Sequence, residues 1–108
     1  MFGDLMGMMG KLKETQDRME KAKADLKLFE VSEVAADGAL QVVVTGAGSI
    51  KNISISEDLL ADKEIVEDLL VVTLNKALAV AKTHESKVLE EVAKVDMPML
   101  PGMDQLFK

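Results

Sequence analysis

The sequence predicts an α+β domain in which one helix, three antiparallel strands and a second helix follow one another along the chain. Apolar residues recur at helical spacing over residues 11–27, alternate with polar residues over 28–56, and return to helical spacing over 63–95. The chain has 108 residues, a length typical of one domain, so we expect a single domain over 1–108.

The first helix is expected from Lys11 to about Lys27, and it carries a short heptad seam. Four apolar residues stand seven positions apart, namely Leu5, Leu12, Met19 and Leu26. This spacing is typical of a helix that pairs with another helix, although the polar Gln16 interrupts the seam. Residues 1–10 hold three glycines, which discourage a stable helix, so we expect a flexible start there.

Three strands are expected where the periodicity changes to two, at Leu28–Ala36, Ala39–Thr45 and Ile50–Ser56. Asp37-Gly38 is a strong signal for a hairpin turn, and a second loop of small residues spans 46–49. Such short connections predict an antiparallel meander. The apolar face of the sheet is expected to consist of Phe29, Val31, Leu40, Val42, Val44, Ile53 and Ile55.

The second helix is expected over 63–95, after Asp62, which is a favourable N-cap residue. Residues 69–81 are apolar on nearly every side of this helix, whereas a three-stranded sheet can cover only one side. We therefore expect burial between two subunits. Residues 96–108 contain two prolines and a glycine and cannot be helical throughout, so they predict a flexible tail.

The composition argues against several classes of chemistry. The chain has no cysteine, which excludes disulfides and thiol catalysis and fits the cytoplasm. No apolar run reaches the length of about 18 residues that a membrane span needs, and the start lacks the pattern of a secretory signal. The aromatic residues are three Phe, so no exposed ring is expected for stacking on bases.

His84 is the single histidine, and we interpret it as an edge residue of the second helix without a partner. Its neighbours one helical turn away are apolar or basic and offer no further metal ligands. No serine has a histidine at a spacing that indicates a triad, and loop 46–49 lacks the lysine of a phosphate-binding loop. The sequence therefore predicts no enzyme, with no catalytic residue, metal, cofactor or small-molecule substrate.

The charge is unevenly distributed along the chain. The formal net charge is −6, yet residues 1–30 hold six basic and six acidic side chains, so the whole deficit lies in 31–108. The first helix is therefore the one segment where a cationic surface can form. At 100° per residue its basic side chains divide between two flanks of the seam. One flank carries Lys11, Arg18 and Lys21, and the other carries Lys13, Lys23 and Lys27.

Several short motifs, taken in order, give a resemblance to a known family. Met1-Phe2-Gly3 precedes a Met-rich stretch, and Val42–Gly48 is followed by Ile50 and Ile53-Ser54-Ile55. Asp58-Leu59-Leu60 is followed by Glu67–Leu70, and Pro101-Gly102-Met103 precedes Leu106-Phe107. In their order, spacing and total length these segments resemble the YbaB/EbfC family of bacterial nucleoid-associated proteins over nearly the whole chain.

This resemblance implies an α-β-β-β-α subunit that forms a tweezer-like homodimer and binds DNA at the nucleoid, with effects on nucleoid organisation and gene regulation. The first helices are then expected to project as arms that contact phosphates without reading bases. The expected DNA-binding residues are Lys11, Lys13, Arg18, Lys21, Lys23 and Lys27. The sheet and the apolar half of the second helix would form the shared body, with Leu69, Leu70, Leu74 and Leu78 at the dimer interface.

A second interpretation is a protein-interaction or chaperone module of the prefoldin type, in which helices flank a β region and grip other proteins. The acidic balance of the chain favours it, and so do flexible apolar methionines near both ends. These are Met6, Met8, Met9, Met97, Met99 and Met103. Against it, the two helices are shorter and less well matched in length than such a module usually has.

Overall fold

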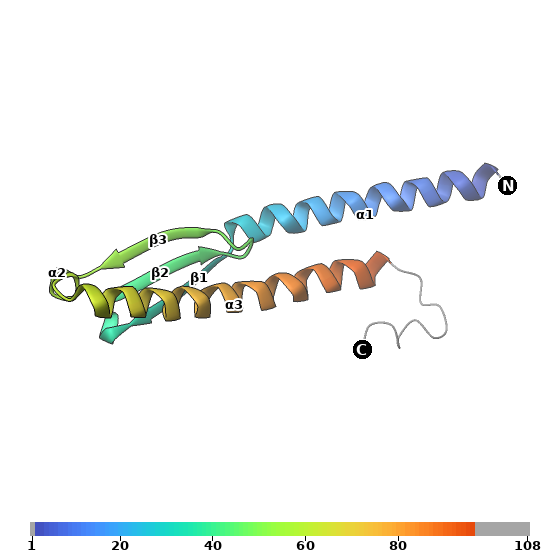
Figure 1. The fold of residues 1–108 in the computed structure, drawn as a ribbon. Helices are drawn as coiled ribbons and strands as arrows, with labels where there is room; N and C mark the ends of the chain where they lie inside the picture. The colour runs from blue at the N-terminus through green and yellow to red at the C-terminus, as the bar shows by residue number, and fades with distance from the viewer. Residues whose placement is uncertain (1, 97–108) are drawn as a thin grey trace, which may run out of the picture.

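A computed structural model describes residues 2–96, with side chains from 5 to 94, and shows an elongated arrangement of two helices and a small sheet (Figure 1). The elements are α1 (Phe2–Leu28), β1 (Glu30–Ala35), β2 (Leu40–Thr45), β3 (Ile50–Ile55), α2 (Glu57–Leu60) and α3 (Lys63–Asp96). The α+β prediction is confirmed. The predicted flexible tail lies, apart from Asp96, outside the described residues.

The three strands form one antiparallel sheet in the order β1-β2-β3, so the predicted meander is confirmed. Val31 pairs with Val44, and Leu40 pairs with Ile55. The turn at Asp37-Gly38 forms as expected, because both residues adopt the positive φ angles, 56° and 93°, that favour Asp and Gly in such turns.

The core lies between α3 and one face of the sheet. Leu40, Val42 and Val44 on β2 are fully buried, and Ala77 and Ala81 of α3 pack against them. The two alanines have small side chains, which allow the helix to approach the central strand closely. Because α3 contacts β1 and β2 most, the outer strand β3 is covered less.

Two residues of the predicted apolar face differ from expectation. Phe29 and Ile53 are 41% and 40% exposed, whereas Val31 on the same face is buried. Ile53 lies on β3, away from most of α3. Phe29 stands in the single residue between α1 and β1, where the strand alternation does not yet hold. The prediction that both residues join the core is therefore wrong.

The first helix begins at Phe2 rather than Lys11, so the prediction that the glycines prevent a helix over residues 2–10 is wrong. Each exposed helical glycine costs about 1 kcal/mol relative to alanine, but the leucines and methionines between them are strong helix formers. From its C-terminal half onward α1 runs antiparallel to α3, and its N-terminal part extends beyond the end of α3 (Figure 1).

Burial along the heptad seam follows this arrangement. Leu26 is buried against α3 and Met19 is partly buried, whereas Leu12 and Leu5 are 63% and 58% exposed. The seam therefore pairs with another helix over its last turns only.

Gly46 sets the close approach of β2 to the end of α1. Its N–H donates to the Phe29 carbonyl at 2.8 Å, and a methyl group on Gly46 would lie 2.9 Å from the Leu26 carbonyl oxygen. We expect Gly46→Ala to destabilise the fold by about 1–3 kcal/mol because backbone must move to admit the methyl group. Thermal unfolding by circular dichroism measures this loss.

The matched control for this prediction is Gly10→Ala. Gly10 is helical and has no atom within 4 Å of the position of a new methyl group. This change should raise stability by up to about 1 kcal/mol, since alanine is the better helix former. If the two variants melt at the same temperature, the contact between β2 and α1 does not constrain residue 46.

Candidate nucleic-acid interface

The basic side chains of α1 are all exposed to solvent, which is the first requirement for contact with phosphates. Arg18 and Lys21 line a groove on one side of the contact between α1 and α3. Lys23 and Lys27 line a second groove on the other side. The predicted division between two flanks is therefore confirmed for these four residues.

The lysines of α1 differ from most other lysines in their ion pairing. Lys51, Lys63, Lys76 and Lys94 each pair with a glutamate, at Glu30, Glu67, Glu33 and Glu90 respectively. In the described part of the chain, by contrast, Lys11, Lys13, Lys21, Lys23 and Lys27 take part in no ion pair. A phosphate can therefore meet these α1 lysines without first displacing a carboxylate.

The pairing of Lys21 with Asp17, one helical turn earlier, was expected from their spacing. The structure leaves Lys21 without a carboxylate partner among the described residues, so this expectation is wrong. Both side chains are exposed, and such pairs stabilise a helix by only a few tenths of a kcal/mol, so little holds them together.

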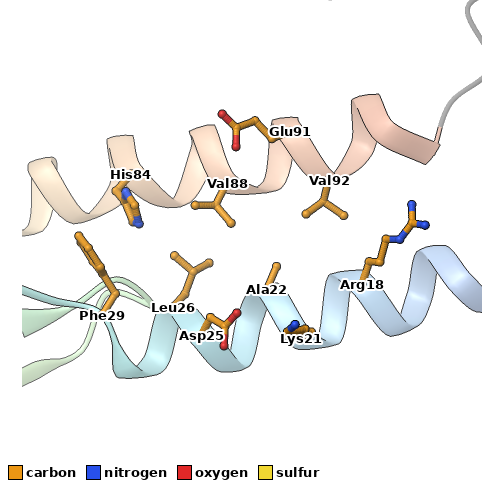
Figure 2. A pocket seen from close by; sticks show the side chains of 10 residues that line it. All are labelled: Arg18, Lys21, Ala22, Asp25, Leu26, Phe29, His84, Val88, Glu91 and Val92. Carbon is orange, nitrogen blue, oxygen red and sulfur yellow. The ribbon is translucent and has the colours of Figure 1, made fainter.

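The groove beside Arg18 and Lys21 has a volume of about 440 Å³ and lies between α1 and α3 (Figure 2). Ala22, Leu26, Val88 and Val92 give it an apolar lining. Asp25 and Glu91 also line it and balance the two basic side chains. The groove is therefore an apolar seam between helices with a neutral rim, and phosphates are better met on the outer surface of α1.

One end of this groove is closed by a pair of stacked rings. Phe29 and His84 face each other with ring centroids 3.8 Å apart and an angle of 15° between the planes (Figure 2). His84 is partly buried, so the prediction of an edge histidine without a partner is wrong. The expected absence of an exposed ring is also wrong, because Phe29 is 41% exposed.

This stack gives His84 a role in joining α3 to the junction of α1 and β1. We expect His84→Ala to lower the free energy of unfolding by about 1 kcal/mol, since stacked aromatic pairs contribute about 0.5–1.5 kcal/mol beyond buried area. Thr83→Ala on the neighbouring exposed position should be nearly neutral. Chemical denaturation of His84→Ala, Phe29→Leu and the double variant measures the coupling, and additive losses would contradict the stack.

The whole-chain comparison identifies the family. The sequence matches the model of the YbaB/EbfC DNA-binding family over residues 1–96. The chain belongs to this family. The resemblance predicted from the sequence motifs is therefore confirmed.

Relatives in this family carry names that agree. A nucleoid-associated protein of Flavobacterium johnsoniae is 52% identical over 105 residues, which cover 97% of this chain and 99% of that protein. A nucleoid-associated protein of Rhizobium meliloti is 34% identical over 106 residues, covering 96% and 98%. The crystal structure of an uncharacterized protein from Helicobacter pylori matches with a TM-score of 0.74 at 19% identity, over 86% of this chain and 97% of that one. That likeness shows that the fold is shared.

The apolar half of α3 in this YbaB/EbfC chain is exposed on the sides that the sheet leaves open. Leu69, Leu70, Leu74 and Leu78, the predicted interface residues, are partly buried and pack against the core of their own chain. Val71 and Val72 between them are 61% and 66% exposed. Helical periodicity could have separated these two sets only if the side facing the sheet had been known.

Other site types find little support in the described residues. No cluster of three or more His, Asp or Glu side chains there could hold a metal ion, and the absence of metal and cofactor remains a prediction. Within the same part of the chain, none of the helices combines the length and hydropathy that crossing a membrane requires.

Proposed function

We propose that this protein is a nucleoid-associated protein that binds DNA through phosphate contacts made by the basic side chains of α1. The family is a DNA-binding family, and the relatives described above are named as nucleoid-associated proteins. The observation that supports the site is that the five lysines of α1 are exposed and take part in no ion pair within the described residues. Lysine and arginine side chains supply most of the affinity of proteins for the DNA backbone.

Binding of this kind would depend little on sequence. Phosphate contacts fix the position of a protein on the duplex, but they carry no information about the bases. The rest of the chain carries the net charge of −6 and would be repelled by phosphate, so only α1 would approach the duplex. The two flanks of α1 offer Lys21 on one side and Lys23 on the other, which would allow the helix to meet the backbone at either flank.

The same proposal includes a homodimer. Val71 and Val72 leave apolar surface on α3, and Leu69, Leu70, Leu74 and Leu78 lie beside them, so a second subunit would bury this side of the helix. Two α1 arms would then double the number of cationic contacts. The protein would act in the cytoplasm at the nucleoid, as a single domain with flexible ends, without catalysis, metal or cofactor.

One structural observation favours the second candidate, a module that grips other proteins. The start of α1 exposes a group of large apolar side chains, which can adapt to varied partners. These are Leu5, Met6, Met8, Met9 and Leu12.

One experiment separates the two candidates. Fluorescence anisotropy of a labelled random-sequence duplex at about 50 and 200 mM salt measures binding, and an aggregation-suppression assay with a denatured client runs beside it. Each neutralised phosphate should lower the logarithm of affinity by about 0.9 per unit of log salt. The proposal predicts clear salt-sensitive binding. No binding to DNA at low salt, together with suppression of client aggregation, would favour the second candidate.

A further inference from the structure

The first turns of α1 carry an apolar stripe, which consists of Leu5, Met8 and Leu12 and is named the N-terminal stripe here. These side chains are 58%, 63% and 63% exposed. At 100° per residue they fall within about 60° of Leu26 around the helix axis. The N-terminal stripe is therefore a direct continuation of the face that α1 buries against α3.

The stripe loses its partner because α3 ends beside the middle of α1. Arg18 of α1 and Val92 of α3 line the same groove, and the two helices run antiparallel (Figures 1 and 2). Asp96, one turn after Val92, then lies beside about residue 14 of α1. Beyond this point α1 continues for about 18 Å at 1.5 Å per residue.

The chain that follows Asp96 starts next to this uncovered face. Residues 97–108 reach about 40 Å when extended, which is more than twice the length of the uncovered part of α1. Pro98 and Pro101 cannot continue the hydrogen bonding of α3, so an extended course suits this segment. Half of its side chains are large and apolar, namely Met97, Met99, Leu100, Met103, Leu106 and Phe107.

We propose that residues 97–108 pack against the N-terminal stripe of α1 in the same chain and act as a strap over it. A tethered segment has an effective concentration in the millimolar range at a site within its reach, so modest contacts are sufficient. A second copy of α1 suits the stripe less well. The stripe spans only about one heptad before the polar Thr15 and Gln16, and stable coiled coils need several.

The absence of native cysteine makes a direct test possible, because a single introduced thiol reports on one position. Met8→Cys places the thiol on the stripe, and Met6→Cys places it about 200° around the helix, on the opposite side. Both are made in the full chain, once with the native segment 97–108 and once with Leu100, Met103 and Leu106 replaced by Asp. The rate of alkylation by iodoacetamide is measured for all four proteins.

The strap predicts that the Asp substitutions speed alkylation at position 8 by about tenfold, equivalent to about 1.4 kcal/mol of docking free energy. They should leave alkylation at position 6 unchanged. Equal and fast reaction at position 8 with either tail would show an uncovered stripe and overturn the proposal. Slow reaction at position 8 that ignores the tail but weakens on dilution would overturn it too, since a second copy would then cover the stripe.

Discussion

Val71→Asp combined with Val72→Asp is expected to convert the protein from a dimer into a folded monomer. In the single chain these side chains are 61% and 66% exposed, so their carboxylates would remain in water and cost the subunit little. At a subunit interface they would be buried without a partner, at a cost of at least about 3 kcal/mol. The dissociation constant of the dimer should therefore rise by at least about 100-fold.

Light scattering after size exclusion measures this change, with circular dichroism to confirm that the subunit is folded. Asn75→Asp is the matched control, since it adds a negative charge at an exposed position of the same helix and should leave the dimer intact. Leu74→Asp or Leu78→Asp should instead unfold the chain, because both leucines pack against its core. A wild-type protein that is already monomeric, or a double Asp variant that remains dimeric, would rule out this interface.

The strands and the start of α3 could be predicted because their signals are local. Alternation of apolar and polar residues located all three strands, and the observed bounds agree to within two residues at each end. Asp62 caps α3 as expected, since its Oδ1 accepts a hydrogen bond from the Ile65 N–H at 3.3 Å. In each case the deciding contact joins residues close in sequence.

The errors arose where two elements compete or where tertiary contacts decide. The glycines of the first turns pointed to a flexible start, but the neighbouring leucines and methionines continue the helix to Phe2. Alternation placed Phe29 on the sheet, whereas its position between α1 and β1 turns its ring toward His84. That pair is far apart in sequence, so no periodicity could reveal it.

The candidate site was predictable in part. Helical geometry divides the basic residues of α1 into two flanks, and the two grooves beside the α1–α3 contact agree with that division. The ion-pairing state of each lysine was not predictable. Spacing suggested a partner for Lys21 in Asp17, and only the placement of the side chains shows which lysines remain available.

Lys21→Glu combined with Lys23→Glu is expected to weaken binding to any duplex while leaving the fold and the dimer intact. The two exposed lysines lie on opposite flanks of α1, so the pair removes a contact from each. Release of about 0.9 counterion into about 0.15 M salt contributes roughly 1 kcal/mol per contact, so two lost contacts should reduce affinity by about 30-fold. The loss should be similar for unrelated sequences, because phosphates do not carry sequence information.

Lys82→Glu combined with Lys87→Glu is the control for this variant. Both lysines are exposed on α3 and take part in no ion pair within the described residues, and the pair changes the net charge by the same amount. If general repulsion of an acidic protein were the cause, both pairs would weaken binding equally. A contact surface on α1 predicts that the α3 pair has much the smaller effect.

The slope of log affinity against log salt, measured for the wild type and both double variants on one random duplex, tests the contact surface most directly. The α1 surface predicts that Lys21→Glu with Lys23→Glu flattens the slope by about 0.9 for each lost phosphate contact, whereas Lys82→Glu with Lys87→Glu leaves it near the wild-type value. An unchanged slope for the α1 pair, or a flatter slope for the α3 pair, would show that DNA meets the protein elsewhere.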